Sequence, residues 1–80
     1  MRIPRDIDGD KLARLLSRFD YEVTRQTGSH IRLTTLRNGE HHMTVPNHRP
    51  LKVGTLNALI TDVADHLGLS KEDVLRALFS

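Results

Sequence analysis

The dipeptide Asn38-Gly39 constrains this chain more than any other feature, because it stands between two runs of alternating apolar and polar residues. Asparagine and glycine accept the positive φ angles that a type I′ turn requires at both of its central positions. Strands over His30–Leu36 and about His41–Val45 are therefore predicted to pair antiparallel as a hairpin. The rest of the 80 residues must then cover one face of this sheet, because so small a chain has to share one core.

Alternation also predicts a third strand and assigns the side chains to two faces. The run Tyr21–Gln26 places Tyr21 and Val23 on one side, and the break Thr27-Gly28-Ser29 separates it from the hairpin. The apolar face of the hairpin is expected to carry Ile31, Leu33, Met43 and Val45, and the opposite face His30, Arg32, Thr34, His42 and Thr44. We therefore expect a sheet with one apolar face and one polar, basic face.

Helical spacing flanks the predicted strands on both sides. The apolar positions 12, 15, 16 and 19 predict a helix over Gly9–Phe19 that Asp8 caps, and those at 56, 59, 60, 63 and 67 predict a long helix that ends at Gly68. Pro46–Lys52 is expected to be an ordered loop, and Ser70 to cap a last helix over Lys71–Phe79. The sequence thus predicts one α+β domain over residues 1–80, in the order α-β-β-β-α plus a C-terminal helix, with the helices on one face of a three-stranded antiparallel sheet. Double-stranded-RNA-binding domains have this order.

Composition narrows the class of partner. The chain has no cysteine, which fits a reducing cytosol and excludes disulfides and thiolate chemistry. No apolar run approaches the roughly 20 residues that cross a bilayer, so we expect a cytoplasmic protein without a membrane partner. Residues 1–52 carry a net charge of +4 and residues 53–80 a net charge of −2. Such a cationic segment favours an anionic polymer, although charge alone fits an ordinary solvated surface equally well.

The segment Gly28-Ser29-His30 is the first place to look for chemistry. An imidazole titrates near neutral pH, so His30 can take a proton from a ribose 2′-hydroxyl or give one to a leaving oxygen without a metal. Gly28 would let a phosphate approach the backbone and Ser29 would add a hydrogen bond, while Arg25 and Arg32 would balance charge in the transition state. Judged on its own, the triplet fits a surface histidine beside a turn better than a catalytic one.

Other polar residues are candidates for binding. Neighbouring residues on a strand point to opposite faces, so His41 and His42 are not expected to chelate one metal ion, and no cofactor is predicted. His42 and His48 are candidate phosphate contacts or second proton-transfer groups, although an exposed side chain without function fits either one better. The start of the long helix, with Arg49, Lys52, Gly54 and Thr55, would favour an anion, but a plain helix cap fits the spacing as well. The aromatic residues Phe19, Tyr21 and Phe79 fall on predicted core faces, which leaves no platform for stacking bases.

The ordered series of these motifs resembles the HicA toxin family. A first helix is followed by Gly28-Ser29-His30 opening the second strand, then by Thr44-Val45-Pro46 with His48, and then by Gly54-Thr55-Leu56 opening a helix. The resemblance spans almost the whole chain. It implies a fold like that of double-stranded-RNA-binding domains, metal-independent cleavage of messenger RNA with His30 as the catalytic residue, and a HicB-family antitoxin as the partner.

Two other functions fit the same residues. The chain would be a non-catalytic module if it gripped structured RNA by shape and phosphate contacts without cutting it. It would be a protein-interaction domain if its basic face met an acidic partner. Product formation separates the first alternative from a ribonuclease, and copurification with and without nuclease treatment identifies the second.

Overall fold

The computed structural model describes residues 2–80 and contains the predicted elements in the predicted order. They are α1 (Gly9–Leu15), a 3₁₀ turn η1 (Leu16–Phe19), β1 (Glu22–Gln26), β2 (His30–Thr35), β3 (His41–Pro46), α2 (Val53–Leu67) and α3 (Lys71–Phe79). The strands form one antiparallel sheet in the order β1-β2-β3. The α+β fold class with an additional C-terminal helix is therefore confirmed.

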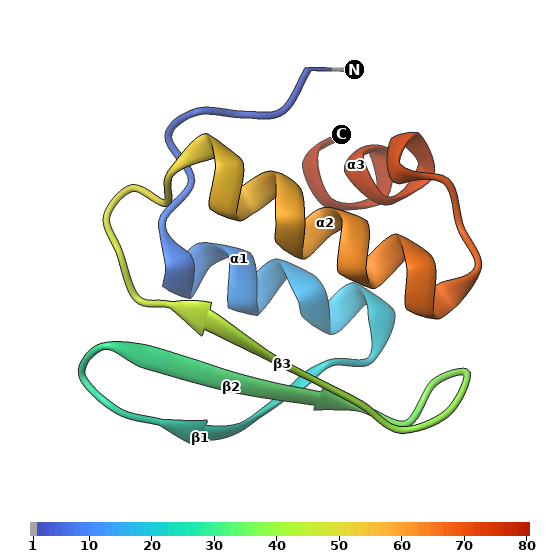
Figure 1. The fold of residues 1–80 in the computed structure, drawn as a ribbon, viewed down its shortest axis with the longest axis horizontal. Coiled ribbons are helices and arrows are strands. Elements are labelled where there is room, and N and C mark those ends of the chain that lie inside the picture. Colours follow the sequence, from blue (N-terminus) through green and yellow to red (C-terminus); the bar gives the residue numbers. More distant parts are fainter. Residues whose placement is uncertain (1) are drawn as a thin grey trace.

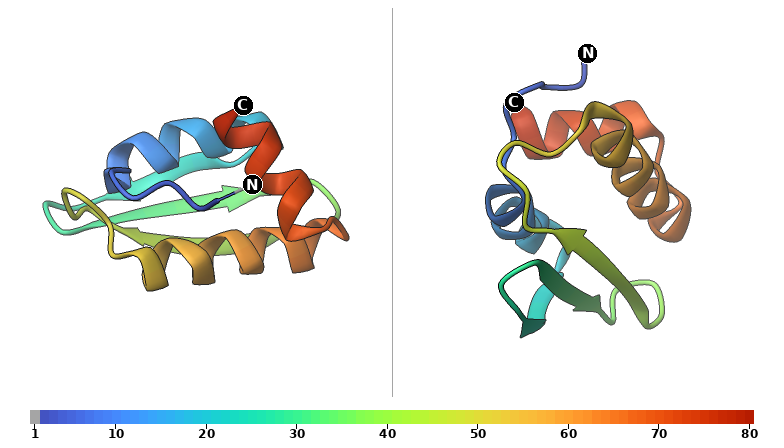
Figure 2. Two further views of the ribbon diagram at one scale, coloured as in Figure 1. Left: turned by 90° about the horizontal axis from the view of Figure 1, so that it is seen from above. Right: turned by 60° about the vertical axis from the view of Figure 1, so that its left-hand side comes forward.

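The helices all lie on one side of the sheet. Figure 1 shows α1 and α2 side by side above the strands, and the right-hand view of Figure 2 shows that the other face of the sheet stays open. The third helix packs on α2 and on η1. There Arg18 donates from Nη1 to the carbonyl oxygens of Ala77 (2.6 Å) and Leu78 (3.2 Å), which places a cation at the end of α3 where the helix dipole favours it. None of the helices within residues 2–80 is long and apolar enough to cross a membrane.

The buried side chains form one cluster between the sheet and the helices. The sheet contributes Ile31, Leu33, Met43 and Val45, as alternation predicts, and the helices contribute Leu12, Leu16, Leu56, Ile60 and Val63. Tyr21 and Phe19 are also buried, while Phe79 is half-buried against the cluster.

Val23 lies on the helix side of the sheet, the side that alternation predicts for it with Tyr21, but its side chain is 51% exposed and does not join the core. Val23 pairs with Leu33 and so stands on the helix side of the sheet, but β1 is an edge strand that the helices do not cover. The pairing also slips between Val23 and Arg25, where a bulge interrupts the register.

The hairpin between β2 and β3 is present, with a longer connection than a two-residue turn. Asn38 (φ 58°) and Gly39 (φ 99°) both have the positive φ angles that the sequence requires. The strands close at the pair Thr35 and His41, so five residues connect them, and the N–H of Gly39 donates to the carbonyl oxygen of Leu36 (3.2 Å).

The helix ends follow the sequence closely except at α1. Ser70 caps α3 by accepting from the N–H of Asp73 (3.0 Å), and Gly68 ends α2 in the left-handed conformation (φ 67°). Asp8 has the extended conformation of an N-cap, but its side chain makes no capping hydrogen bond, which corrects that expectation. The first helix also tightens into η1 instead of staying α-helical to Phe19.

Candidate functional site

Two loops and two helix starts meet at one end of the molecule. The β1–β2 loop, the loop from β3 to α2, and the first turns of α1 and α2 lie at the left of Figure 1, and both views of Figure 2 agree with this grouping. Most of the candidate residues fall in these segments, so the fold gathers residues that are up to 27 positions apart in the sequence, from Gly28 to Thr55.

His30 begins β2 with an exposed and oriented imidazole. The backbone N–H of His30 donates to Oγ1 of Thr27 (3.1 Å), and the backbone carbonyl oxygen of His30 accepts from the N–H of Thr27 (2.9 Å). These two bonds close the turn around Gly28 and Ser29. The hydroxyl of Ser29 is hydrogen-bonded to Nδ1 of His30 (2.9 Å). Within residues 2–80 no group bonds to Nε2, so that nitrogen is free to meet a ligand.

Asn47 fixes the turn that carries the imidazole. Its N–H donates to the carbonyl oxygen of Ser29 (2.9 Å), and its Nδ2 donates to that of Gly28 (3.3 Å). Asn47 carries no periodicity or motif that would mark it in the sequence, because it acts on residues 18 and 19 positions away in the chain. The one available signal was its place directly after Pro46, which pairs with His30 once the hairpin register is known.

The β3–α2 loop is anchored by close backbone contact with α1. The N–H of Gly9 donates to the carbonyl oxygen of His48 (3.0 Å), and the N–H of Leu51 donates to that of Ile7 (2.8 Å). The side chain of His48 is exposed, at the same end of the molecule as His30. The peptide bond between Arg49 and Pro50 is cis.

The cations of this end differ in their partners. Arg49 forms an ion pair with Asp10 (3.8 Å), and Arg14 pairs with the same carboxylate (3.6 Å), so the charge of Arg49 is partly balanced.

Lys52 is exposed at the N-cap of α2 and no side chain caps that helix. Gly54 is exposed and Thr55 half-buried in the first turn of α2, with open space around the Cα of Gly54. The N–H groups of this turn are therefore accessible to an anion.

Arg25 and Arg32 stand opposite each other on the open face of the sheet. The two residues pair across β1 and β2, and both side chains are exposed. Neither forms an ion pair with any residue in the described range 2–80. Like charges directly across a pair of strands repel, so an anion bound between them would relieve an unfavourable contact. This pair lies two residues along β2 from His30.

His42 lies on the same face at the far end of the sheet. It pairs with Thr34, four residues from His30 along β2, which is about 13 Å at the rise of a strand. Its Nδ1 is hydrogen-bonded to Oγ1 of Thr34 (2.7 Å), and its Nε2 faces Oε2 of Glu40 (3.0 Å). The structure therefore does not bring His42 next to His30, and both of its ring nitrogens are already engaged.

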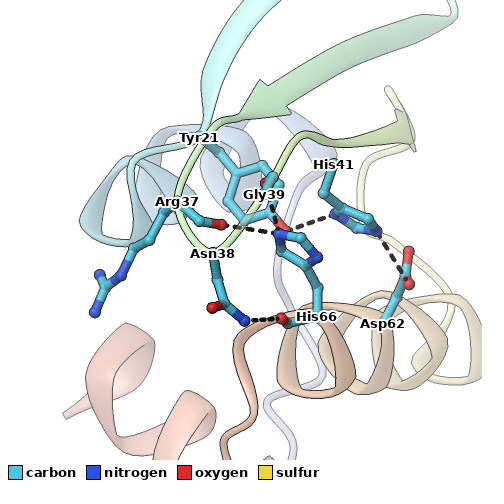
Figure 3. A network of polar contacts seen from close by, with 7 residues as sticks. All are labelled: Tyr21, Arg37, Asn38, Gly39, His41, Asp62 and His66. Atoms are coloured by element: carbon cyan, nitrogen blue, oxygen red, sulfur yellow. Dashed lines mark hydrogen bonds and ion pairs between the residues drawn. The ribbon is translucent and has the colours of Figure 1, made fainter.

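His41 points to the helix side, away from its neighbour His42. Its Nδ1 is hydrogen-bonded to the hydroxyl of Tyr21 (2.8 Å), its Nε2 faces Asp62 (3.3 Å), and its ring stacks on that of His66 with centroids 4.4 Å apart. Figure 3 shows these contacts, in which His66 also donates from Nε2 to the carbonyl oxygens of Arg37 (2.9 Å) and Gly39 (3.0 Å). This network ties the β2–β3 turn to the end of α2, which is a structural role.

Burial affects one titratable group of that network. The pKa of Tyr21 is raised to about 12, first because burial disfavours the phenolate and second because Asp62 lies nearby with a negative charge. Across residues 2–80 no three His, Cys, Asp or Glu side chains gather where they could hold a metal ion.

The geometry defines a small α+β domain with an exposed imidazole at one end of a basic, open sheet face. A comparison with protein-family models identifies the family: the model described as the HicA toxin of bacterial toxin-antitoxin matches residues 9–64. The chain therefore belongs to the HicA toxin family, and it is the toxin component of a toxin–antitoxin pair with an antitoxin as its partner. The comparisons with curated proteins and with solved structures found no match.

Proposed function

We propose that this toxin is an endoribonuclease that cleaves messenger RNA with His30 as its acid/base group and that a HicB-like antitoxin neutralises it. The observation that carries the proposal is the free Nε2 of an exposed His30 whose Nδ1 is held by Ser29. A hydrogen bond at one ring nitrogen fixes the orientation of the ring and leaves the other nitrogen to exchange a proton with the substrate.

The reaction needs only groups that this end of the molecule offers. His30 removes the proton of a ribose 2′-hydroxyl, the 2′-oxygen attacks the adjacent phosphorus, and the bond from phosphorus to the 5′-oxygen breaks. The leaving 5′-oxygen takes up a proton from a water molecule, and His30 returns its own extra proton to the solvent, which gives a 2′,3′-cyclic phosphate and a 5′-hydroxyl. Metal ions take no part in these steps.

Charge supports phosphate binding beside the imidazole. Arg25 and Arg32 are exposed, adjacent and without an acidic partner within residues 2–80, so they can hold the phosphodiester and balance the added charge of the transition state. Gly28, Ser29 and His48, together with Arg49, Lys52, Gly54 and Thr55 at the start of α2, would hold neighbouring phosphates. An antitoxin that covers this end would exclude RNA from it.

Cleavage assays on purified protein test the proposal. Wild type and His30→Ala are compared on one RNA in the presence of EDTA, with the fold of each verified by circular dichroism. General acid/base catalysis contributes about 10²- to 10⁴-fold in rate, so His30→Ala should lose at least about a hundredfold. The exposed position of His30 predicts that the fold is retained.

His42→Ala is the matched comparison, since His42 is a second exposed histidine on the same sheet face. Its two nitrogens are occupied by Thr34 and Glu40, so its loss should affect RNA affinity at most and leave the rate at saturating RNA within about threefold. Equal rates for wild type and His30→Ala would refute the assignment of His30. Salt-sensitive RNA binding without any product would instead identify a non-catalytic RNA-binding module.

A further inference from the structure

The open face of the sheet arranges its side chains in rows that lead away from His30. The first row holds His30 opposite Pro46, and the second holds Arg32 opposite Arg25. The third holds Thr34 opposite Glu22 and His42. Successive rows are about 6.6 Å apart, because residues i and i+2 of a strand share a face. A strand of RNA with its phosphate at His30 can therefore continue over the arginine pair to the third row.

A hollow in the surface begins at the third row. Its volume is about 560 Å³, within the range of roughly 300–1,000 Å³ that is typical of small-molecule sites. It is lined by Asp20, Glu22, Thr24, Thr34, Leu36 and Arg37. These residues come from the start of β1, the end of β2 and the turn that follows it, so the hollow lies at the end of the sheet opposite to His30.

The lining combines an apolar wall with hydrogen-bonding groups. The side chain of Leu36 is 74% exposed and offers a flat ring an apolar surface. The carboxylate of Glu22 is exposed, and within residues 2–80 it pairs with no cation. Arg37, which also lines the hollow, forms an ion pair with Asp20 (3.9 Å) and lies over the ring of Phe19 (5.8 Å). Among the charged side chains that line the hollow, Glu22 is therefore the one without an ion-pair partner within residues 2–80, and its carboxylate can accept hydrogen bonds from a ligand.

We propose that this hollow is a nucleobase subsite that selects a base with an exocyclic amino group, and the proposal rests on the RNA cleavage proposed above. A carboxylate only accepts hydrogen bonds, so Glu22 favours the amino groups of cytosine, adenine and guanine. Uracil has no amino group, and its single donor on that edge, the N3–H, lies between two carbonyl oxygens that the negative charge of Glu22 repels. The neutral ring would lie against Leu36, while the phosphates remain over Arg25 and Arg32.

The cleavage pattern on RNA of random sequence tests the subsite. At one fixed distance from the cut, the wild type should disfavour uridine by about tenfold, the usual size of one base contact. Glu22→Gln should reduce this discrimination to about twofold, because an amide can also donate a hydrogen bond to the carbonyl oxygens of uracil. Leu36→Ala should slow cleavage at every base by a similar factor.

Glu40→Gln is the matched control, since it removes an exposed carboxylate of the β2–β3 turn that does not line the hollow. It should leave the discrimination against uridine unchanged. If the wild type cuts RNA in a His30-dependent way while Glu22→Gln keeps the wild-type discrimination, the subsite is refuted and the ribonuclease assignment stands.

A binding measurement separates the two proposals when no cleavage is found. Pentacytidylate and pentauridylate are titrated into His30→Ala protein, and the backbone amide resonances are followed by NMR. Pentacytidylate should shift the amides of Thr24, Thr34 and Leu36 with about tenfold higher affinity than pentauridylate. Shifts confined to the His30 end, or equal affinities, would refute the subsite independently of catalysis.

Discussion

Alanine substitutions at Gly9 and Gly54 should change stability in opposite directions, although both glycines lie in the first turn of a helix. Helix propensity alone favours alanine at both positions by up to about 1 kcal/mol. A Cβ on Gly9 would overlap with the carbonyl oxygen of Pro46 and come within 3.1 Å of Cα of Asn47. Both are backbone atoms, so a rotamer change cannot remove the clash. A Cβ on Gly54 meets nothing within 4 Å.

The loss of stability expected for Gly9→Ala arises because the backbone of Pro46 and Asn47 would have to move away from α1. Inserting a methyl group into a packed site costs about 1–3 kcal/mol, and the upper end applies here because the clash is with backbone atoms. After a gain of up to about 1 kcal/mol in helix propensity, Gly9→Ala should lower the free energy of unfolding by about 2 kcal/mol. For a domain of this size each kcal/mol shifts Tm by roughly 4–8 °C. Gly9→Ala should therefore melt roughly 10 °C below wild type, and Gly54→Ala at or slightly above it.

Thermal unfolding followed by circular dichroism measures both variants under one condition. The hydrogen bond from Gly9 to His48 fixes α1 against the loop that carries Asn47, so Gly9→Ala should also slow RNA cleavage. A Tm for Gly9→Ala equal to that of wild type would show that α1 leaves room for a methyl group beside the backbone of Pro46 and Asn47.

Two further predictions concern polar groups of the fold. Thr35→Val should lower the free energy of unfolding in denaturant by about 1–3 kcal/mol. The buried Thr35 hydroxyl donates to the carbonyl oxygen of Phe19 (3.2 Å) and accepts from the N–H of Arg37 (3.1 Å), so an unchanged unfolding midpoint would contradict these hydrogen bonds. Tyr21 is the only tyrosine, and its pKa of about 12 in the folded protein lies above the ordinary value of 10.0, so unfolding releases a proton in alkaline solution. The contribution of the Tyr21 hydroxyl to the free energy of unfolding should be fully present below pH 10 and be lost as the pH rises toward 12. An absorbance titration that shows phenolate in the folded protein near pH 10 would refute the burial of this hydroxyl.

Local signals in the sequence predicted the elements well. Helix α3 begins and ends as predicted, because Ser70 and the N–H of Asp73 are only three residues apart and need no tertiary partner. The same holds for Gly68 and for Asn38-Gly39, whose backbone conformations are selected by their own side chains. Alternation identified the buried side of β2 and β3 because helices cover that side along both strands.

The errors arise where distant segments decide the outcome. Val23 has the alternation of a half-buried strand, but its exposure depends on how far the helices extend over the sheet edge. Asn47 and Gly9 matter through contacts with residues 18 to 39 positions away, which no local pattern encodes. The stacked rings of His41 and His66 likewise require the fold to bring β3 next to the end of α2.

The candidate site was predicted in part. The motif Gly28-Ser29-His30 indicated the residue that bears a free ring nitrogen, and the alternation of β2 indicated that Arg32 shares its face. The sequence did not reveal that Arg25 stands opposite Arg32, because the bulge in β1 sets that pairing. It also gave no sign of the hollow, whose lining combines strand ends with a turn.

The chemistry of the cut ends tests the role of His30 most directly. An RNA is prepared with a single 2′-deoxy sugar at a mapped cleavage site, and its products are compared with those of the all-ribose RNA by mass spectrometry. We predict a 2′,3′-cyclic phosphate and a 5′-hydroxyl from the all-ribose RNA, no cleavage at the deoxy position, and at least about a hundredfold slower formation of both products with His30→Ala. A 5′-phosphate end, or cutting at the deoxy sugar at an undiminished rate, would contradict proton transfer from the 2′-hydroxyl to His30.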